Sequence, residues 1–265
     1  MMDLSECLTN NTSIYLTRDR SMKKGLLYRD ETPELFIKDF NHAEFIGEEL
    51  CTIKNLRCAH YFLVGIGMCN LKRSAKHGEI QRSRDHYKYK IASYDFRDST
   101  KKYKHLADYK FPDGDRFHQL LDRTPNAENR EELCSDLLNM LALDIYMGQD
   151  DRTVNNILLE LDHEENIRLA PLYDFEYSLK SNYVGKNTIH GCSDLINLND
   201  YEFIKEFMEE YPEFRDKLAS YLDINLCKVI SNAYNKNGLV VPSDRWHFYQ
   251  EFDEDRKEVI KKIIK

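Results

Sequence analysis

Several features that would assign the chain to a special class are missing from its sequence. Polar residues follow Met1 in place of an apolar segment, and no later stretch approaches the roughly 18 uncharged residues of a membrane-spanning helix. We therefore expect no export signal, no membrane span and a cytoplasmic location. The seven cysteines are odd in number, scattered and without paired Cys-x-x-Cys spacing, which argues against a disulfide framework and against a zinc site.

Internal repeats, low-complexity tracts and linkers rich in Pro, Gly or Ser are also missing from the 265 residues. Any lobes should therefore pack directly against each other. The 42% of hydrophobic residues and 12% of aromatic residues are typical of a folded globular chain. A net charge of −8 argues against general binding of nucleic acid. Residues 1–125 are slightly basic, and the rest of the chain is strongly acidic.

The front half of the chain predicts strands and one helix. Residues 26–28 and 34–40 are expected to pair as a hairpin. Asn41 is a suitable N-cap for a helix that runs to about residue 53. Further strands are predicted at 61–66 and 89–94.

The back half predicts helices around a second hairpin. Apolar residues recur at helical spacing up to a stop near Gly148, and strands are expected at 156–161 and 167–172. From residue 201 onward the pattern is helical again, with one stripe running from Leu218 to Ile230. This order of elements favours a two-lobed α+β architecture.

The segment between the long helix and the second hairpin is unusually polar. It contains Asp151 and Asn156, and the hairpin returns the chain to Asp174 just after its second strand. Hard oxygen ligands of this kind suit Mg²⁺ and not zinc or copper. Phosphoryl transfer needs one carboxylate to orient the attacking hydroxyl and two oxygen ligands to hold the metal against the phosphates. We therefore predict that these three side chains converge beneath a triphosphate.

The pattern Gly-x-x-Asp-x-x-x-x-Asn followed by Leu-x-Pro-Leu-Tyr-Asp resembles the catalytic and metal loops of HipA-like serine/threonine kinases. The segment Asp-Arg-x-x-x-Asn-Ile is also similar to that of phosphoinositide kinases. The resemblance implies that Asp151 is the catalytic base and that Asn156 and Asp174 are metal ligands. It further implies ATP and Mg²⁺ as cofactors, a kinase-like fold, and transfer to Ser/Thr hydroxyls of a protein substrate, including hydroxyls of the chain itself.

The same resemblance assigns roles in the front half. Lys38 is similar to the lysine that contacts the nucleotide phosphates, and Glu44 to its partner on the helix. Lys23 occupies the place of a lysine in the phosphate-covering loop. The positions that would touch adenine are Ser93, Tyr94 and Asp95. The implied lobes are a small β-rich N-lobe with one key helix, residues 1–96, and a larger, mainly helical C-lobe, residues 97–265.

Other interpretations of these residues remain open. Asp and Asn also favour turns for backbone reasons, Lys38 could be a solvent-facing lysine of an edge strand, and Glu44 could serve only the helix dipole. Thr153 stands where the family usually has His, and the segment around Lys23 lacks the family's glycine. A kinase of a non-protein alcohol such as an inositide, and a nucleotide-binding pseudokinase that acts as an interaction module, are the alternative functions.

Overall fold

The structure is a computed structural model that describes most of the chain. The described residues are 2–3, 25–29, 32–67, 87–112, 115–185, 189, 194–196 and 200–265. Lys23, predicted to contact phosphate, lies outside them.

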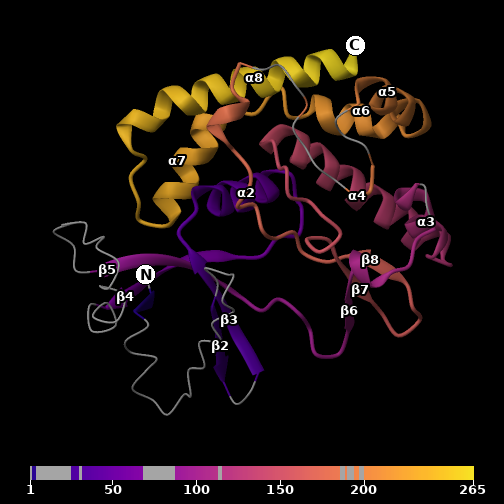
Figure 1. Cartoon of the computed structure of the whole chain (residues 1–265), viewed down its shortest axis with the longest axis horizontal. Coiled ribbons are helices and arrows are strands. Elements are labelled where there is room, and N and C mark those ends of the chain that lie inside the picture. The colour runs from indigo at the N-terminus through magenta and orange to yellow at the C-terminus, as the bar shows by residue number, and fades with distance from the viewer. Residues whose placement is uncertain are drawn as a thin grey trace.

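A five-stranded sheet occupies the front half of the described chain (Figure 1). Its spatial order is β1-β4-β5-β3-β2, with β1 parallel to β4 and the remaining neighbours antiparallel. The predicted hairpin and the two further strands are confirmed. The strands are β1 (Met2–Asp3), β2 (Gly25–Arg29), β3 (Thr32–Asp39), β4 (Tyr61–Gly67) and β5 (Tyr87–Tyr94).

The predicted helix of the front half is α2 (His42–Ile53), and it begins where the sequence indicates. The Asn41 side chain accepts a hydrogen bond of 2.9 Å from the amide of Ala43, which satisfies one of the free amides at the helix start. Phe45, Ile46 and Leu50 are buried. The helix is packed between β4 and α7 (Leu226–Lys236) (Figure 1).

A three-stranded antiparallel sheet and a long helix form the centre of the back half. The predicted helix is α4 (Ala127–Met147), and Gly148 ends it with a left-handed φ of 61°. The predicted hairpin is β7 (Leu158–Leu161) with β8 (Ile167–Leu169). The strand β6 (Lys102–His105), which pairs with β7, was not predicted, because three of its four residues are polar and exposed.

The C-terminal segment is helical as predicted, but the stripe from Leu218 to Ile230 is not one helix. One helix ends at Ala219, and Asn225 caps the next by accepting a hydrogen bond of 3.0 Å from the amide of Lys228. The capping side chain offers the backbone an alternative to a continuous helix. The remaining helices are α3 (Arg116–Asp122), α5 (Tyr201–Glu210), α6 (Pro212–Ala219) and α8 (Trp246–Ile264), with short 3₁₀ turns at Leu106–Asp108, Ser181–Tyr183 and Ser243–Arg245.

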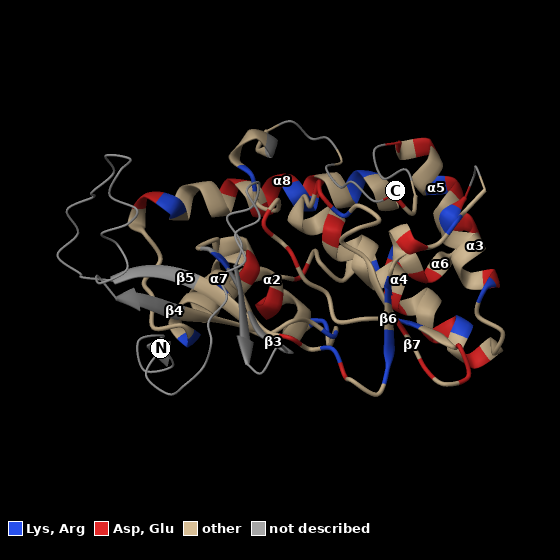
Figure 2. Cartoon of the chain, turned by 60° about the horizontal axis from the view of Figure 1, so that its bottom comes forward, with Lys and Arg blue, Asp and Glu red and all other residues tan. Residues whose placement is uncertain are grey.

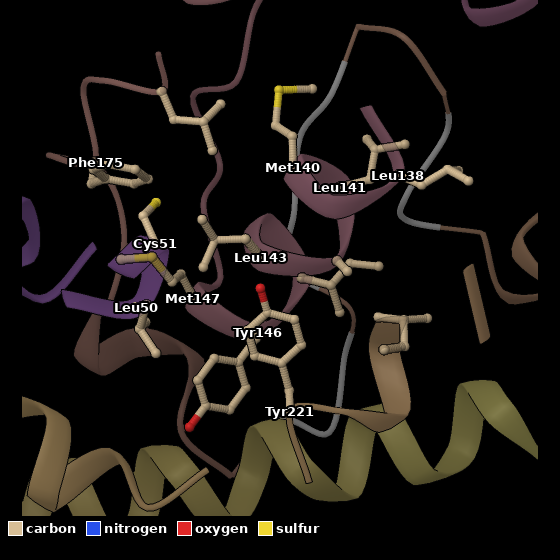
Figure 3. Close-up of a cluster of buried hydrophobic side chains, with 14 of the residues drawn as sticks. Leu50, Cys51, Leu138, Met140, Leu141, Leu143, Tyr146, Met147, Phe175 and Tyr221 are labelled. Atoms are coloured by element: carbon tan, nitrogen blue, oxygen red, sulfur yellow. The ribbon is translucent and has the colours of Figure 1, made fainter. Parts of the chain in front are cut away.

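Buried side chains from both halves meet at the end of α4. Figure 3 shows Leu50 and Cys51 of α2 beside Met147, with Phe175 close by. The rings of Tyr146 and Tyr221 lie 4.9 Å apart in the same cluster. This continuous core fixes α2 relative to the loop that follows α4.

Both signs of charge are interleaved along the C-terminal helices, and Figure 2 shows β6 in the blue of its two lysines. Within the described ranges, no helix combines the length and the apolar character that crossing a membrane requires.

His118 links α3 to α5 and gives the fold a pH-dependent contact. Burial alone would lower the pKa of His118, but the hydrogen bonds and charges of Asp115 and Glu210 outweigh it and the pKa is raised. The contacts of protonated His118 therefore stabilise the fold fully below its unfolded-state pKa of about 6.5. This contribution is lost as the pH rises through the folded-state pKa. We expect His118→Gln to lower the melting temperature at pH 5.5 and to change it little at pH 8.5. Equal effects at the two pH values would contradict this contact.

Candidate active site

Three side chains from distant segments converge at the centre of the molecule. The ammonium of Lys38, on β3, forms an ion pair with Glu44 of α2 and stands 3.0 Å from Oδ1 of Asp174, just beyond β8. Glu44 is fully buried, and the side chains of Lys38 and Asp174 are each only 12% exposed. The structure therefore brings together three of the residues predicted from the sequence. This geometry is incompatible with Lys38 as a free edge-strand lysine.

A bend in the backbone and two hydrogen bonds from backbone amides position the side chains of this site. Asp174 has a left-handed φ of 60°, which is uncommon for a residue with a side chain and bends the chain sharply at this point. Its amide donates to the Tyr61 hydroxyl at 3.1 Å, and the next amide, that of Phe175, donates to Glu44 Oε2 at 3.1 Å. One carboxylate of α2 thus fixes both the lysine and the loop that carries Asp174.

The charge of Lys38 is maintained by its neighbours. Burial alone would lower the pKa of Lys38, but the charges and hydrogen bonds of Glu44 and Asp174 outweigh burial, and the pKa is raised above its ordinary value. The ammonium is therefore a fixed positive charge in a largely enclosed position. Such a charge can neutralise an anionic group that approaches Asp174.

The loop after α4 brings Asp151 and Asn156 into contact. The Asn156 side-chain amide donates to the Asp151 carbonyl at 2.7 Å and to its Oδ2 at 3.1 Å. The amide of Asn156 donates to the Thr153 carbonyl at 2.9 Å, so the loop closes as a turn. Because the nitrogen of the Asn156 side chain faces Asp151, its oxygen is directed elsewhere.

Two residues that the sequence interpretation did not assign connect this loop to Asp174. The Gln149 side chain accepts from the amide of Asp151 at 3.2 Å and donates to the carbonyl of Asp174 at 2.8 Å. Arg152 donates from one nitrogen to the carbonyl of Tyr173 at 2.8 Å and to that of Asn156 at 3.4 Å. The two loops are thus joined through their backbones.

Arg152 is fully buried and is balanced by an equally buried Asp144 of α4, 3.1 Å away. Burial disfavours the charged guanidinium, but Asp144 outweighs it and the pKa of Arg152 is raised. The sequence did contain a signal for this pair, because Asp144 falls on the buried stripe of the helix one turn after Leu141. An acid on a buried stripe implies a buried cationic partner.

Close packing of Gly47 against Phe175 sets the distance between α2 and the Asp174 loop. A Cβ at Gly47 would stand 2.5 Å from Cγ of the buried Phe175 ring. We expect Gly47→Ala to destabilise the fold by about 1–3 kcal/mol through overpacking, although alanine favours a helix by about 1 kcal/mol. Urea denaturation measures this change. Phe175→Leu should recover part of the loss in the double variant, and purely additive effects would contradict a clash with the ring.

The predicted adenine contacts lie at the end of β5. Lys38 pairs in register with Ile91, two residues before Ser93, so this end of β5 neighbours the strand that carries the lysine. Ser93 is buried and Tyr94 is 49% exposed. The carboxylate of Asp95 accepts a hydrogen bond of 2.6 Å from the Arg97 guanidinium. The role of these three residues toward adenine stays a prediction.

The oxygen donors of the site fit a hard divalent cation. No group of three or more His, Cys, Asp and Glu side chains able to hold a metal occurs within the part of the chain that the structure describes. Magnesium does not need such a cage, because it usually binds one or two protein carboxylates together with waters and phosphate oxygens. The Asp174 carboxylate and the amide oxygen of Asn156 are donors of the type that such a site uses.

The fold is that of two-lobed kinases, with a β-rich lobe containing one key helix and a mainly helical lobe. The kinase CtkA of Helicobacter pylori, described as proinflammatory, superimposes with a TM-score of 0.63 at 12% identity over 100% of this chain and 97% of that one. HipA of Shewanella oneidensis MR-1, solved with HipB and operator DNA, superimposes with a TM-score of 0.56 at 11% identity over 98% of this chain and 70% of that one.

These likenesses confirm the predicted fold class and, at the level of the fold, the resemblance to HipA-like kinases. No family model matches the sequence, and no curated protein resembles it significantly.

Proposed function

We propose that the chain is an ATP- and Mg²⁺-dependent kinase that transfers the γ-phosphoryl group to Ser/Thr hydroxyls of proteins, its own hydroxyls included. The observation that carries the proposal is the placement of one largely enclosed ammonium, that of Lys38, between the carboxylates of Glu44 and Asp174. A buried Lys–Glu pair next to a metal-binding Asp is the arrangement that protein kinases need for activity.

In this proposal each side chain has one task. Lys38 neutralises phosphate charge, and Glu44 holds its ammonium in place. Asp174 and Asn156 hold the metal. Asp151, hydrogen-bonded to Asn156, orients the acceptor hydroxyl and accepts its proton. Bound Mg²⁺-ATP would supply the γ-phosphoryl group, with ADP as the leaving group, and the metal would partly neutralise the negative charge of the phosphate oxygens.

The remaining predicted contacts complete the nucleotide site. Ser93, Tyr94 and Asp95 contact the adenine at the end of β5, and Lys23 adds a second positive charge toward the phosphates. Residues 1–96 form the lobe that covers the nucleotide, and residues 97–265 form the lobe that carries the catalytic and metal loops.

A transfer assay with labelled ATP tests the proposal. Wild type should transfer label to itself or to a generic protein acceptor in the presence of Mg²⁺, and a chelator should abolish the transfer. Asp151→Asn should reduce the rate by about 10²-fold or more, because it removes the proton acceptor. Asp150→Asn is the matched control, since the neighbouring carboxylate is paired with Lys180 at 2.8 Å. If wild type shows neither label transfer nor ATP turnover, the proposed kinase activity is refuted and a nucleotide-binding interaction module is favoured.

A further inference from the structure

The helix α7 contacts α2 at its first residue and again two turns further on. At the start of α2, the rings of His42 and Tyr234 are stacked with centroids 5.4 Å apart and planes 4° apart, and the Tyr234 hydroxyl shares a hydrogen bond with His42 Nδ1. Two turns later, the buried Glu49 forms an ion pair with Lys236. Glu49 also accepts a hydrogen bond of 3.4 Å from the side-chain amide of Asn232.

A third contact holds the end of α2. Lys54, which caps α2, donates to the carbonyl of Ser220 at 2.7 Å. Its ammonium also lies 4.4 Å from the ring centroid of Tyr221. Figure 1 shows α2 enclosed between the sheet on one side and α7 and α8 on the other. The helix is therefore fixed along its length by the C-terminal segment.

Glu44 lies between these contacts, two residues after His42 and five before Glu49. A helix moves as a unit, so a rotation or shift of α2 that breaks the contacts with α7 also displaces Glu44 from Lys38. The cost of such a shift is high at Glu49, because a buried carboxylate that loses its cation is left uncompensated.

We infer that α7 is a positioning element for α2, and that its contacts with His42 and Glu49 keep Glu44 at Lys38. The catalytic consequence rests on the proposed function. Tyr234 and Lys236 are positioning residues, because they act on Lys38 only through α2. Kinases of this fold need the Lys–Glu pair in place for activity. Here a segment nearly 200 positions downstream of the helix, 192 for His42 and Tyr234, supplies that control.

The reactivity of Lys38 toward an acylating reagent measures the Lys38–Glu44 contact without any kinase activity. In wild type the paired ammonium should react slowly with an N-hydroxysuccinimide acetate ester. Tyr234→Leu and Lys236→Met should each increase the acylation rate of Lys38, followed by mass spectrometry, by about 10-fold. Glu44→Gln removes the charged partner of Lys38 directly and is the positive reference for fast acylation. Lys236→Arg keeps the positive charge at that position and should keep the wild-type acylation rate.

Two comparisons keep the test specific. Lys205→Met breaks an exposed ion pair on α5 and should leave the reactivity of Lys38 unchanged. Hydrogen exchange should become faster in the peptide that covers α2 and stay unchanged in the peptide that covers α4. Unchanged reactivity of Lys38 in both α7 variants would overturn the inference. Equal loss of protection in α2 and α4 in both variants would overturn it as well, since α7 would then only stabilise the whole fold.

The activity measurement separates this inference from the proposed function. If wild type transfers phosphoryl groups, both α7 variants should lower kcat by about 10-fold with little change in the KM of the acceptor. If wild type shows no transfer, the proposed function fails, while the acylation and exchange results still decide whether α7 positions α2.

Discussion

Asp174→Asn should reduce phosphoryl transfer by about 10²-fold or more. The substitution keeps the shape of the side chain but removes the negative charge that faces Lys38 at 3.0 Å and that is proposed to bind the metal. A radiolabel assay at saturating ATP and Mg²⁺ measures the effect as a fall in kcat.

Asp216→Asn, on an exposed face of α6, is the control and should keep the wild-type rate. Thermal denaturation of the Asp174 variant shows whether the chain is still folded when it is assayed. A folded Asp174→Asn protein with more than a tenth of the wild-type rate would remove Asp174 from the catalytic machinery.

Arg152→Met should cause the largest loss of stability of any single change proposed for this chain, about 3–5 kcal/mol in the free energy of unfolding. The variant leaves the fully buried Asp144 without its cation, and it removes the donor to the carbonyls of Tyr173 and Asn156. Urea denaturation followed by circular dichroism measures the loss.

A double variant separates these two causes. In Asp144→Leu with Arg152→Met no buried charge is left unpaired, so the double variant should be more stable than Arg152→Met alone. Equal stability of the two variants would mean that the hydrogen bonds to the loop carbonyls outweigh the buried charge.

The local elements were largely predictable from the sequence. Asn41 identified the start of α2, Gly148 the end of α4, and the polar turn between two apolar runs the β7–β8 hairpin. Caps and turns depend on the residue itself and its nearest neighbours, so they can be recognised without knowing the fold. The strand β6 and the break before Asn225 were missed, because the polar strand depends on pairing with β7 and the break interrupts an apolar spacing that also suits one continuous helix.

The candidate site was predictable in its members but not in its connections. Asp151, Asn156 and Asp174 were found from motif spacing, and Lys38 and Glu44 from the resemblance. Gln149 and Arg152, which join the two loops, have no motif of their own, because their partners are backbone carbonyls and amides that only the folded chain brings within reach. Tyr61 also has no motif of its own, because its hydroxyl accepts a hydrogen bond from the amide of Asp174 only in the folded chain.

The sequence by itself determined where helices and strands begin and which polar residues stand in loops, since these properties depend on contacts within a few positions. Only the tertiary structure decided that Lys38 meets Glu44 and Asp174, and that α7 closes over α2. Those contacts join residues up to 192 positions apart, and their geometry depends on the packing of a whole core rather than on local preference.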